Sequence, residues 1–474
     1  MTLIRLLPLL LALLCMADPA CAAHGPTIPG AEISAIWVIP FACMLLSIAI
    51  MPLALPHFWE HNFGKISVFW GLAFLVPCLI VYGFGTALYE FLHIIILDYI
   101  PFIVLLFALF TVAGGVRLTG SLVGTPVINT VILAVGTLLA SWMGTTGAAM
   151  LLIRPLLRAN AHRRYRVHSV VFFIFLVANI GGSLTPLGDP PLFLGFLKGV
   201  AFFWTMTHLF FKTLCLSLVL LGIYFVLDMI LYKKEGSPVP PHDPEKEEEK
   251  LGLEGVINLV FLAGVVAAVL LSGMFNLGEW LSVYGVPVEG QNLLRDLCLL
   301  GIAGLSWKFT SRQCREKNGF SWAPIEEVAK LFFGIFLSMI PAIAILRAGT
   351  EGALGSLVKM VSTPSGEPVN AMYFWLTGAL SSFLDNAPTY LVFFNTAGGD
   401  AQHLMTDMAT TLIAISAGAV FMGANTYIGN APNFMVRSIA ENQGVKMPSF
   451  FGYMAWSVGI LVPLFGLMTW IFFI

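Results

Sequence analysis

Charged residues are scarce in this chain. Only 11% of its 474 residues are Asp, Glu, Lys or Arg, whereas 58% are hydrophobic, and the mean hydropathy is +0.88. Water-soluble domains carry roughly 25% charged residues, so the composition excludes that class. Apolar runs near the roughly 20 residues that cross a bilayer recur along nearly the whole sequence. We therefore predict an all-α polytopic membrane protein.

Motifs for hydrolysis and for nucleotide binding are absent from the sequence. It contains no His-Glu-x-x-His, no Gly-x-Ser-x-Gly and no phosphate-binding Gly-Lys-Ser/Thr. The seven cysteines show no paired spacing for zinc or for a disulfide framework. We therefore expect neither an enzyme nor an ATP-driven pump, with no cofactor and no nucleic-acid partner.

The N-terminus differs from the rest of the chain. Arg5 precedes an apolar stretch from Leu6 to Leu14, and Ala20-Cys-Ala-Ala23 resembles a signal peptidase site. Residues 1–23 are thus predicted to be a cleavable signal peptide, with a first membrane anchor as the alternative. Cleavage would leave the mature chain starting on the outer side of a bacterial inner membrane.

The chain contains one sequence pattern twice. Gly144-Thr-Thr-Gly147 and Gly182-Ser-Leu-Thr-Pro-Leu-Gly-Asp-Pro-Pro191 return as Asp385-Asn-Ala-Pro388 and Gly423-Ala-Asn-Thr-Tyr-Ile-Gly-Asn-Ala-Pro432, at one offset of 241 residues. Matched helix interruptions in apolar sequence are typical of a transporter with inverted repeats and a binding site between them. The repeat predicts a first unit at 24–231 and a second at 253–474, joined by a cytoplasmic linker at 232–252.

Each half is predicted to hold five spans and one re-entrant hairpin, which gives about 10 transmembrane helices, two hairpins and two broken helices. The loop after the first hairpin carries Arg158, Arg163, Arg164 and Arg166, whereas its counterpart at 399–407 has no Lys or Arg. Equivalent loops of different charge belong on opposite sides of the membrane. The predicted spans are Ile33–Leu53, Ser67–Phe84, Tyr99–Val116, Trp204–Leu231, Gly255–Phe275, Leu293–Lys308 and Ala329–Leu346, followed by a final apolar run. The predicted hairpins are Thr125–Asn160 and Ala371–Gly399. The predicted broken helices are His168–Lys198 and His403–Ala440.

The four helix interruptions form the predicted ion site. Unwound backbone is tolerated at membrane depth only where it is buried in protein or lines a cavity. Two carboxylates lie in the interruptions, Asp189 and Asp385, and exchange of H+ for Na+ at such a group would couple the two ions. The neutral oxygens of the predicted site come from Thr145, Thr146, Thr185, Asn386, Asn425, Thr426 and Asn430. The alternative is that both aspartates only cap half-helices and that the other side chains satisfy local backbone.

Other polar residues of the apolar sequence are explained more simply. Glu90, His93 and Asp98 are expected on an interfacial helix leading into the third span, with a proton relay as the alternative for Asp98. Arg154 is expected to snorkel toward the cytoplasm, with binding of an anionic group as the alternative.

The motifs resemble those of the ion-transporter superfamily of citrate, arsenite and NhaD-type sodium:proton antiporters. The resemblance rests on Ala113-Gly-Gly115 and on the repeated motifs that begin at Gly182, Asp385 and Gly423. It implies a scaffold domain, a moving domain made of hairpins and broken helices, and commonly a homodimer. The acidic interruptions look most like the NhaD branch, whereas carboxylate symporters tend to show Ser-Asn-Thr at both hairpin tips.

These observations together predict a secondary active transporter that exchanges Na+ for H+ by alternating access. Its partners would be Na+, H+, the lipid bilayer and a second copy of the chain. The alternative is a sodium-coupled di- or tricarboxylate symporter resembling citrate transporters, and the third possibility is transport of arsenite or another oxyanion.

Overall fold

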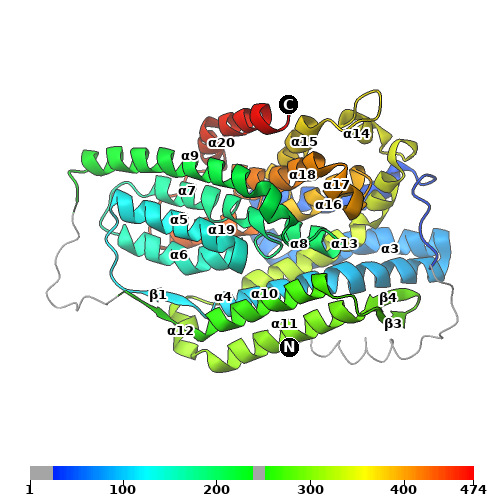
Figure 1. The fold of residues 1–474 in the computed structure, drawn as a ribbon, viewed down its shortest axis with the longest axis horizontal. Helices are drawn as coiled ribbons and strands as arrows, with labels where there is room; N and C mark the ends of the chain where they lie inside the picture. The colour runs from blue at the N-terminus through cyan, green and yellow to red at the C-terminus, as the bar shows by residue number, and fades with distance from the viewer. Residues whose placement is uncertain (1–24, 239–250) are drawn as a thin grey trace.

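The structure is a computed structural model that describes residues 25–238 and 251–474. The predicted signal peptide at 1–23 lies outside the described residues, as does most of the linker at 232–252. Long helices run side by side along the longest axis of the molecule (Figure 1). Within the described ranges, eight helical stretches are long and apolar enough to cross a membrane, and the prediction of an all-α polytopic membrane protein is confirmed.

The first helices include a break in the middle of α3. After η1 (Ala35–Val38) and α2 (Ile39–Ala54), α3 covers Pro56–Ile94, but its backbone is not helical at Gly83, where φ is +82°, so two helical segments meet there. Glu90 and His93 lie on the helical segment after this break, as the predicted end of the second span at Phe84 requires. That this segment lies at the membrane interface stays a prediction. Asp98 is buried in a π-helical turn, η2 (Ile95–Tyr99), which leads into α4 (Ile100–Ala113).

The first hairpin and the first broken helix follow. α5 (Pro126–Met143) and α6 (Thr145–Ala159) meet at Gly144, whose φ of +79° favours glycine. Next come α7 (Val167–Leu176), a 3-10 turn η3 (Ile180–Leu184), α8 (Pro190–Leu197) and the long helix α9 (Trp204–Lys234).

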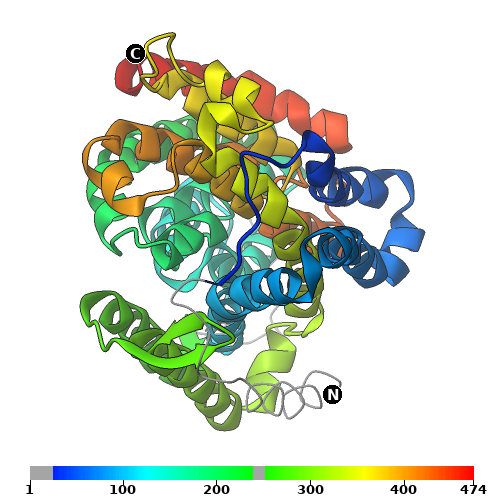
Figure 2. The ribbon, with the colours of Figure 1, turned by 90° about the vertical axis from the view of Figure 1, so that its right-hand side faces the viewer.

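The second half has a corresponding order of elements. It holds α10 (Ile257–Met274), α11 (Gly290–Phe309), α12 (Arg312–Lys317), α13 (Ala323–Arg347), η4 (Gly349–Glu351), α14 (Gly355–Met360), the hairpin helices α15 (Asn370–Phe383) and α16 (Asn386–Thr396), α17 (Ala401–Thr406), α18 (Ala409–Met422), η5 (Gly423–Asn425), α19 (Ala431–Asn442) and α20 (Phe450–Phe472). Viewed along the helices, α10 and α11 lie on the side away from α20 (Figure 2).

Two short antiparallel ribbons were not predicted. β1 (Arg117–Thr119) pairs with β2 (Gly252–Glu254), so that strands from the two halves meet. β3 (Glu279–Val283) and β4 (Val286–Glu289) form a hairpin whose turn residues Tyr284 and Gly285 have φ of 52° and 80°. Positive φ at both central residues is what a tight two-residue hairpin turn needs.

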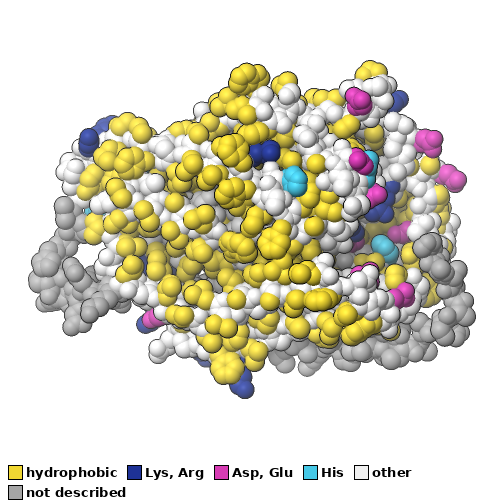
Figure 3. All heavy atoms as spheres, in the orientation of Figure 1, with side chains coloured by type: hydrophobic (Ala, Val, Ile, Leu, Met, Phe, Trp, Pro, Cys, Tyr) yellow, Lys and Arg dark blue, Asp and Glu magenta, His cyan; other side chains and the backbone are white. Residues whose placement is uncertain are grey.

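Hydrophobic side chains are spread over the whole face drawn in Figure 3, and Asp and Glu side chains gather toward one end of the long axis. Large apolar side chains stay exposed along the membrane-length helices, for example Phe211 and Ile230 on α9 and Val260 on α10. Exposed apolar side chains on helices of this length are expected to face lipid.

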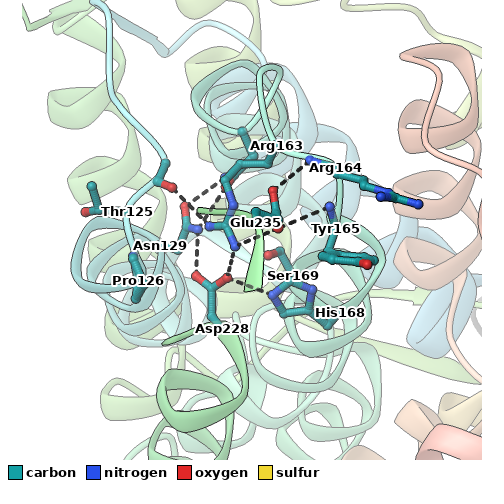
Figure 4. Close-up of polar contacts among 12 residues, drawn as sticks. Thr125, Pro126, Asn129, Arg163, Arg164, Tyr165, His168, Ser169, Asp228 and Glu235 are labelled. Atoms are coloured by element: carbon teal, nitrogen blue, oxygen red, sulfur yellow. Dashed lines mark hydrogen bonds and ion pairs between the residues drawn. The ribbon is translucent and has the colours of Figure 1, made fainter. Parts of the chain in front are cut away.

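A buried ionic cluster fastens the base of the first hairpin. The Asp228 carboxylate on α9 accepts from Arg163 at 2.7 Å, from His168 at 2.9 Å and from Asn129 at 2.9 Å, and Glu235 accepts from Arg163 at 3.4 Å (Figure 4). The Asp228 and Arg163 side chains are both fully buried. Burial lowers the pKa of the Arg163 guanidinium, but the bond and charge of Asp228 outweigh burial and raise it above its usual value.

The same cluster joins both arms of the hairpin. Asn129 on α5 exchanges two hydrogen bonds with Asn160, which follows α6, at 2.9 and 2.7 Å. Arg163 also donates to the Gly124 carbonyl just before α5, at 3.1 Å. These hydrogen bonds therefore fix the base of the hairpin to α7 and α9, whereas the tip of the hairpin takes no part in this cluster.

We expect Asp228→Ala to destabilise the protein strongly, because it leaves the buried Arg163 without its main partner. Breaking a buried ion pair from one side costs roughly 3–5 kcal/mol, and the effect should appear as a large drop in melting temperature in detergent. Glu254→Ala is the matched control, since Glu254 is 41% exposed in its pair with Arg117 and such pairs contribute about 0–1 kcal/mol. Equal melting temperatures for the two variants would contradict this account.

Candidate ion-binding site

The four helix interruptions meet at one place. The Thr145 amide at the first hairpin tip donates to the Gly188 carbonyl in the first broken helix, at 2.9 Å. Asn386 at the second tip donates to Asp189 in that same break. Asn430 in the second broken helix also donates to Asp189, at 3.2 Å. Two hairpins and two broken helices, distant in sequence, thus converge on one carboxylate.

Asp189 lies at the centre of this convergence and is 2% exposed. One carboxylate oxygen accepts from Thr145 Oγ1 and Asn430 Nδ2, both at 3.2 Å, and the other accepts from Asn386 Nδ2. All three donors are neutral, and within the described ranges no Lys, Arg or His pairs with Asp189. Although it precedes α8, its side chain caps no amide, so the interpretation of Asp189 as a helix cap was wrong.

Asp385 has a different environment. It is half-buried at the start of α16, and its carboxylate accepts from the Ala387 amide at 3.1 Å, so the helix-cap interpretation describes this residue. Because the next residue, Asn386, binds Asp189, the two carboxylates lie near each other and their like charges repel. A cation or a proton would relieve that repulsion.

Thr185 and Thr426 frame the two breaks in the same way. The Thr185 hydroxyl donates to the Ser141 carbonyl, and the Thr426 hydroxyl donates to the Ser382 carbonyl at 2.5 Å. Each hydroxyl also accepts from the amide two residues later, at 3.2 Å in both copies. These two predicted site residues therefore bind backbone, as the alternative interpretation expects.

In each break, one glycine allows two parts of the backbone to pass very close to each other. A Cβ on Gly188 would lie 2.1 Å from the Gly182 carbonyl oxygen, and one on Gly429 would lie 2.5 Å from the Gly423 carbonyl oxygen. Distances below 3.0 Å force the backbone to move. Both breaks thus depend on glycine at the same repeat position.

Two buried amide oxygens at the site accept no hydrogen bond within the described part of the chain. Asn386 Oδ1 and Asn425 Oδ1 are buried without a hydrogen-bond partner in the described residues. Their orientation follows from the other end of each amide, because Asn386 Nδ2 binds Asp189 and Asn425 Nδ2 binds Ser382 Oγ at 2.9 Å. Thr146 is half-buried, and no hydrogen bond of its hydroxyl occurs in the described part of the chain. Buried acceptors without donors are rare and suit a hard cation.

Two further asparagines complete the site, and the sequence analysis missed them. Asn430 Nδ2 also donates to Asn179 Oδ1 at 3.2 Å, and Asn179 donates to Asn433 Oδ1 at 2.7 Å. Asn433 in turn donates to the Gly423 and Thr426 carbonyls, both at 2.9 Å. Both could have been predicted from the sequence, because each is an amide side chain in an apolar stretch within a few residues of a helix break.

A family model described as "putative citrate transport" matches residues 30–473, which is nearly the whole chain. The chain belongs to this putative citrate transport family. The family lies within the ion-transporter superfamily that the motifs resemble, so the superfamily prediction is confirmed. Membership in the citrate transport family and the apolar helices identify a multi-pass membrane protein that works as a secondary transporter. A search of curated proteins found no match.

We expect Gly188→Ala to disrupt the site while leaving the outer helices folded, because the new Cβ would collide with backbone rather than with a movable side chain. Transport by the variant should fall to the background of empty liposomes. Gly222→Ala on α9 is the control, since a Cβ there meets nothing within 4 Å. If Gly188→Ala transports as well as the wild type does, the close approach of Gly188 to the Gly182 carbonyl is not needed for transport.

Proposed function

We propose that the protein exchanges Na+ for H+ across the membrane, with Asp189 and Asp385 as the groups at which the two ions compete. The observation that carries the proposal is the Asp189 carboxylate, which is buried among neutral donors and has no cationic side chain beside it among the residues that the structure describes. An uncompensated buried carboxylate costs several kcal/mol, so it favours either a proton or a bound cation. The amide oxygens of Asn386 and Asn425 add acceptors that a proton does not need and Na+ does.

Competition at one place is sufficient to couple the two ions. When the carboxylates are protonated, the repulsion between Asp189 and Asp385 disappears and Na+ loses its negatively charged ligands. When Na+ is bound, both carboxylates stay ionised and the proton is released. If each occupied form crosses the membrane and the empty, doubly charged form does not, exchange follows without any further device.

A sodium-coupled di- or tricarboxylate symporter is the second candidate, and the family description favours it. The same cation site would serve this function, because Na+ bound by the two aspartates would balance part of the charge of an anionic substrate. The hairpin tips Gly144-Thr-Thr-Gly147 and Asp385-Asn-Ala-Pro388 differ from the Ser-Asn-Thr tips expected of carboxylate symporters, and this difference places antiport first. Transport of arsenite or another oxyanion has no separate observation in its favour.

Purified protein in liposomes tests the proposal. Addition of Na+ should dissipate an imposed pH gradient with no organic anion present, and Asp189→Asn and Asp385→Asn should each reduce the exchange to background because asparagine keeps the size but cannot release a proton. Asp407→Asn is the matched control, since Asp407 is exposed and its ion-pair partner among the described residues is His403, on the surface. Uptake of labelled citrate or succinate without sodium-driven proton flux would replace antiport by the symport alternative.

A further inference from the structure

The half-helices that begin at the ion site form two pairs. α8 and α16 start after Asp189 and Asp385 and pack on each other. α6 starts at Thr145 and α19 follows Asn430, and these two helices form the second pair. α16 and α6 extend toward opposite ends of the molecule (Figure 1). Both pairs lie against α4 and α13, which supply no predicted residue of the site, so the interface with α4 and α13 has two ends.

At one end of this interface an ion pair joins α8 to the turn that precedes α4. Lys198 Nζ, at the C-terminus of α8, lies 2.5 Å from Asp98 Oδ1 in η2. The Asp98 side chain is 3% exposed and the Lys198 side chain is 17% exposed. The carboxylate is thus shielded from solvent, whereas part of the lysine side chain reaches the surface.

The end of α8 holds Lys198 in a defined place relative to the ion site. The amides of Gly199 and Val200 donate back to carbonyls of α8, both at 3.0 Å, and φ at Gly199 is +103°. This is a Schellman motif, which ends a helix at a fixed residue. Asp189 lies at the other end of the same short helix, roughly 13 Å away at 1.5 Å per residue. A movement of Lys198 along the helix axis therefore moves Asp189 as well.

A hydrogen bond joins α16 to α13 at the same end of the interface. Arg347 Nε, in the last turn of α13, donates to Asn395 Oδ1 on α16 at 2.8 Å. The two contacts are neighbours, because the charges of the Lys198 to Asp98 pair and of Arg347 all act on His93. Both helices of the pair are thus fastened where they end.

At the other end of the interface, the equivalent positions of the repeat line a cavity. At the offset of 241 residues, Lys198 corresponds to Ile439 on α19 and Asn395 corresponds to Arg154 on α6. Both residues lie in the wall of a cavity of about 130 Å³, and other parts of that wall belong to α4 and to the start of α13. The interface is therefore closed by an ion pair at one end and hollow at the other.

A buried ion pair suits a contact that forms in one state of a protein and breaks in another. Removal of two charges from water offsets most of the attraction between them, so apolar residues of similar volume often stabilise a fold equally well or better. When the pair opens toward solvent, both groups regain water, which offsets the lost attraction. Stability alone therefore does not explain a lysine and an aspartate at this place.

We propose that the Lys198 to Asp98 ion pair closes the interface at its end, and that the pair must break once in every transport cycle for Asp189 to be reached from that end. The Arg347 to Asn395 bond opens in the same step. Lys198 is a positioning residue, because it acts on the place of Asp189 through α8 and does not touch the ion. This inference rests on the proposed transport by alternating access, which Na+:H+ exchange and carboxylate symport share.

A reversible cross-link between the two positions tests this inference. Asp98→Cys and Lys198→Cys are combined in a protein whose native cysteines are replaced by alanine, and the purified protein in liposomes is treated with a bis-methanethiosulfonate reagent. Sodium-driven proton flux should fall to the background of empty liposomes after cross-linking and should return to the level of the untreated variant after reduction. Release of protons on addition of Na+ in detergent, which reports binding, should persist in the cross-linked protein. A pair with only a structural role would leave the flux unchanged.

Arg117→Cys with Glu254→Cys is the matched control, because this ion pair joins β1 to β2 outside the four helices that begin at the site. Undiminished flux after cross-linking of positions 98 and 198, or an equal loss after cross-linking of the control pair, would overturn the proposal. If the first double variant does not fold, Arg347→Cys with Asn395→Cys decides by the same measure. If Na+ drives no proton flux before cross-linking, exchange itself fails and the cross-link is read on uptake of labelled citrate, so the two failures are told apart.

Discussion

A helix that stops inside a membrane leaves amides and carbonyls without partners, and each such group costs several kcal/mol in hydrocarbon. In this protein the hydroxyl groups of Ser141 and Thr185 bind the first break to the hairpin beside it, and Ser382 and Thr426 do the same in the second copy. These bonds hold each hairpin tip against a broken helix. The convergence of the four breaks, and hence the candidate site, follows from this need of the backbone for partners.

The frame around Asp189 is symmetrical although its charge is not. Asp189 and Asn430 occupy the same repeat position and contact each other. Thr145 and Asn386 also occupy equivalent positions, and each donates a hydrogen bond to Asp189. Two copies of one motif thus supply one carboxylate and three neutral donors around a common point. A second carboxylate at position 430 would repel the first, whereas asparagine donates a hydrogen bond to it. Asp385 then adds the second charge from the hairpin tip, where it is more exposed.

Features that depend on residues close together in the sequence could be predicted, whereas contacts between distant segments could not. Composition identified the class of protein, and glycine, proline and the offset of 241 residues located the breaks, because these residues act on their own backbone. The predicted end of the second span at Phe84 lies next to the break at Gly83 inside α3, where glycine again acts on its own backbone. The Asp98 to Lys198 and Asp228 to Arg163 pairs, and the link from Asn179 to Asn433, join segments far apart in sequence. Such pairing depends on packing, which no single segment reveals.

The account rests on Na+ and H+ sharing one buried site, and direct measurement of proton release tests this most simply. Na+ is added to purified protein in weakly buffered detergent solution while the pH is recorded, with choline as the control cation. The account predicts that Na+ releases protons from the wild-type protein, and that the double variant Asp189→Asn and Asp385→Asn releases none. Proton release that persists in the double variant, or Na+ binding without any release, would contradict it.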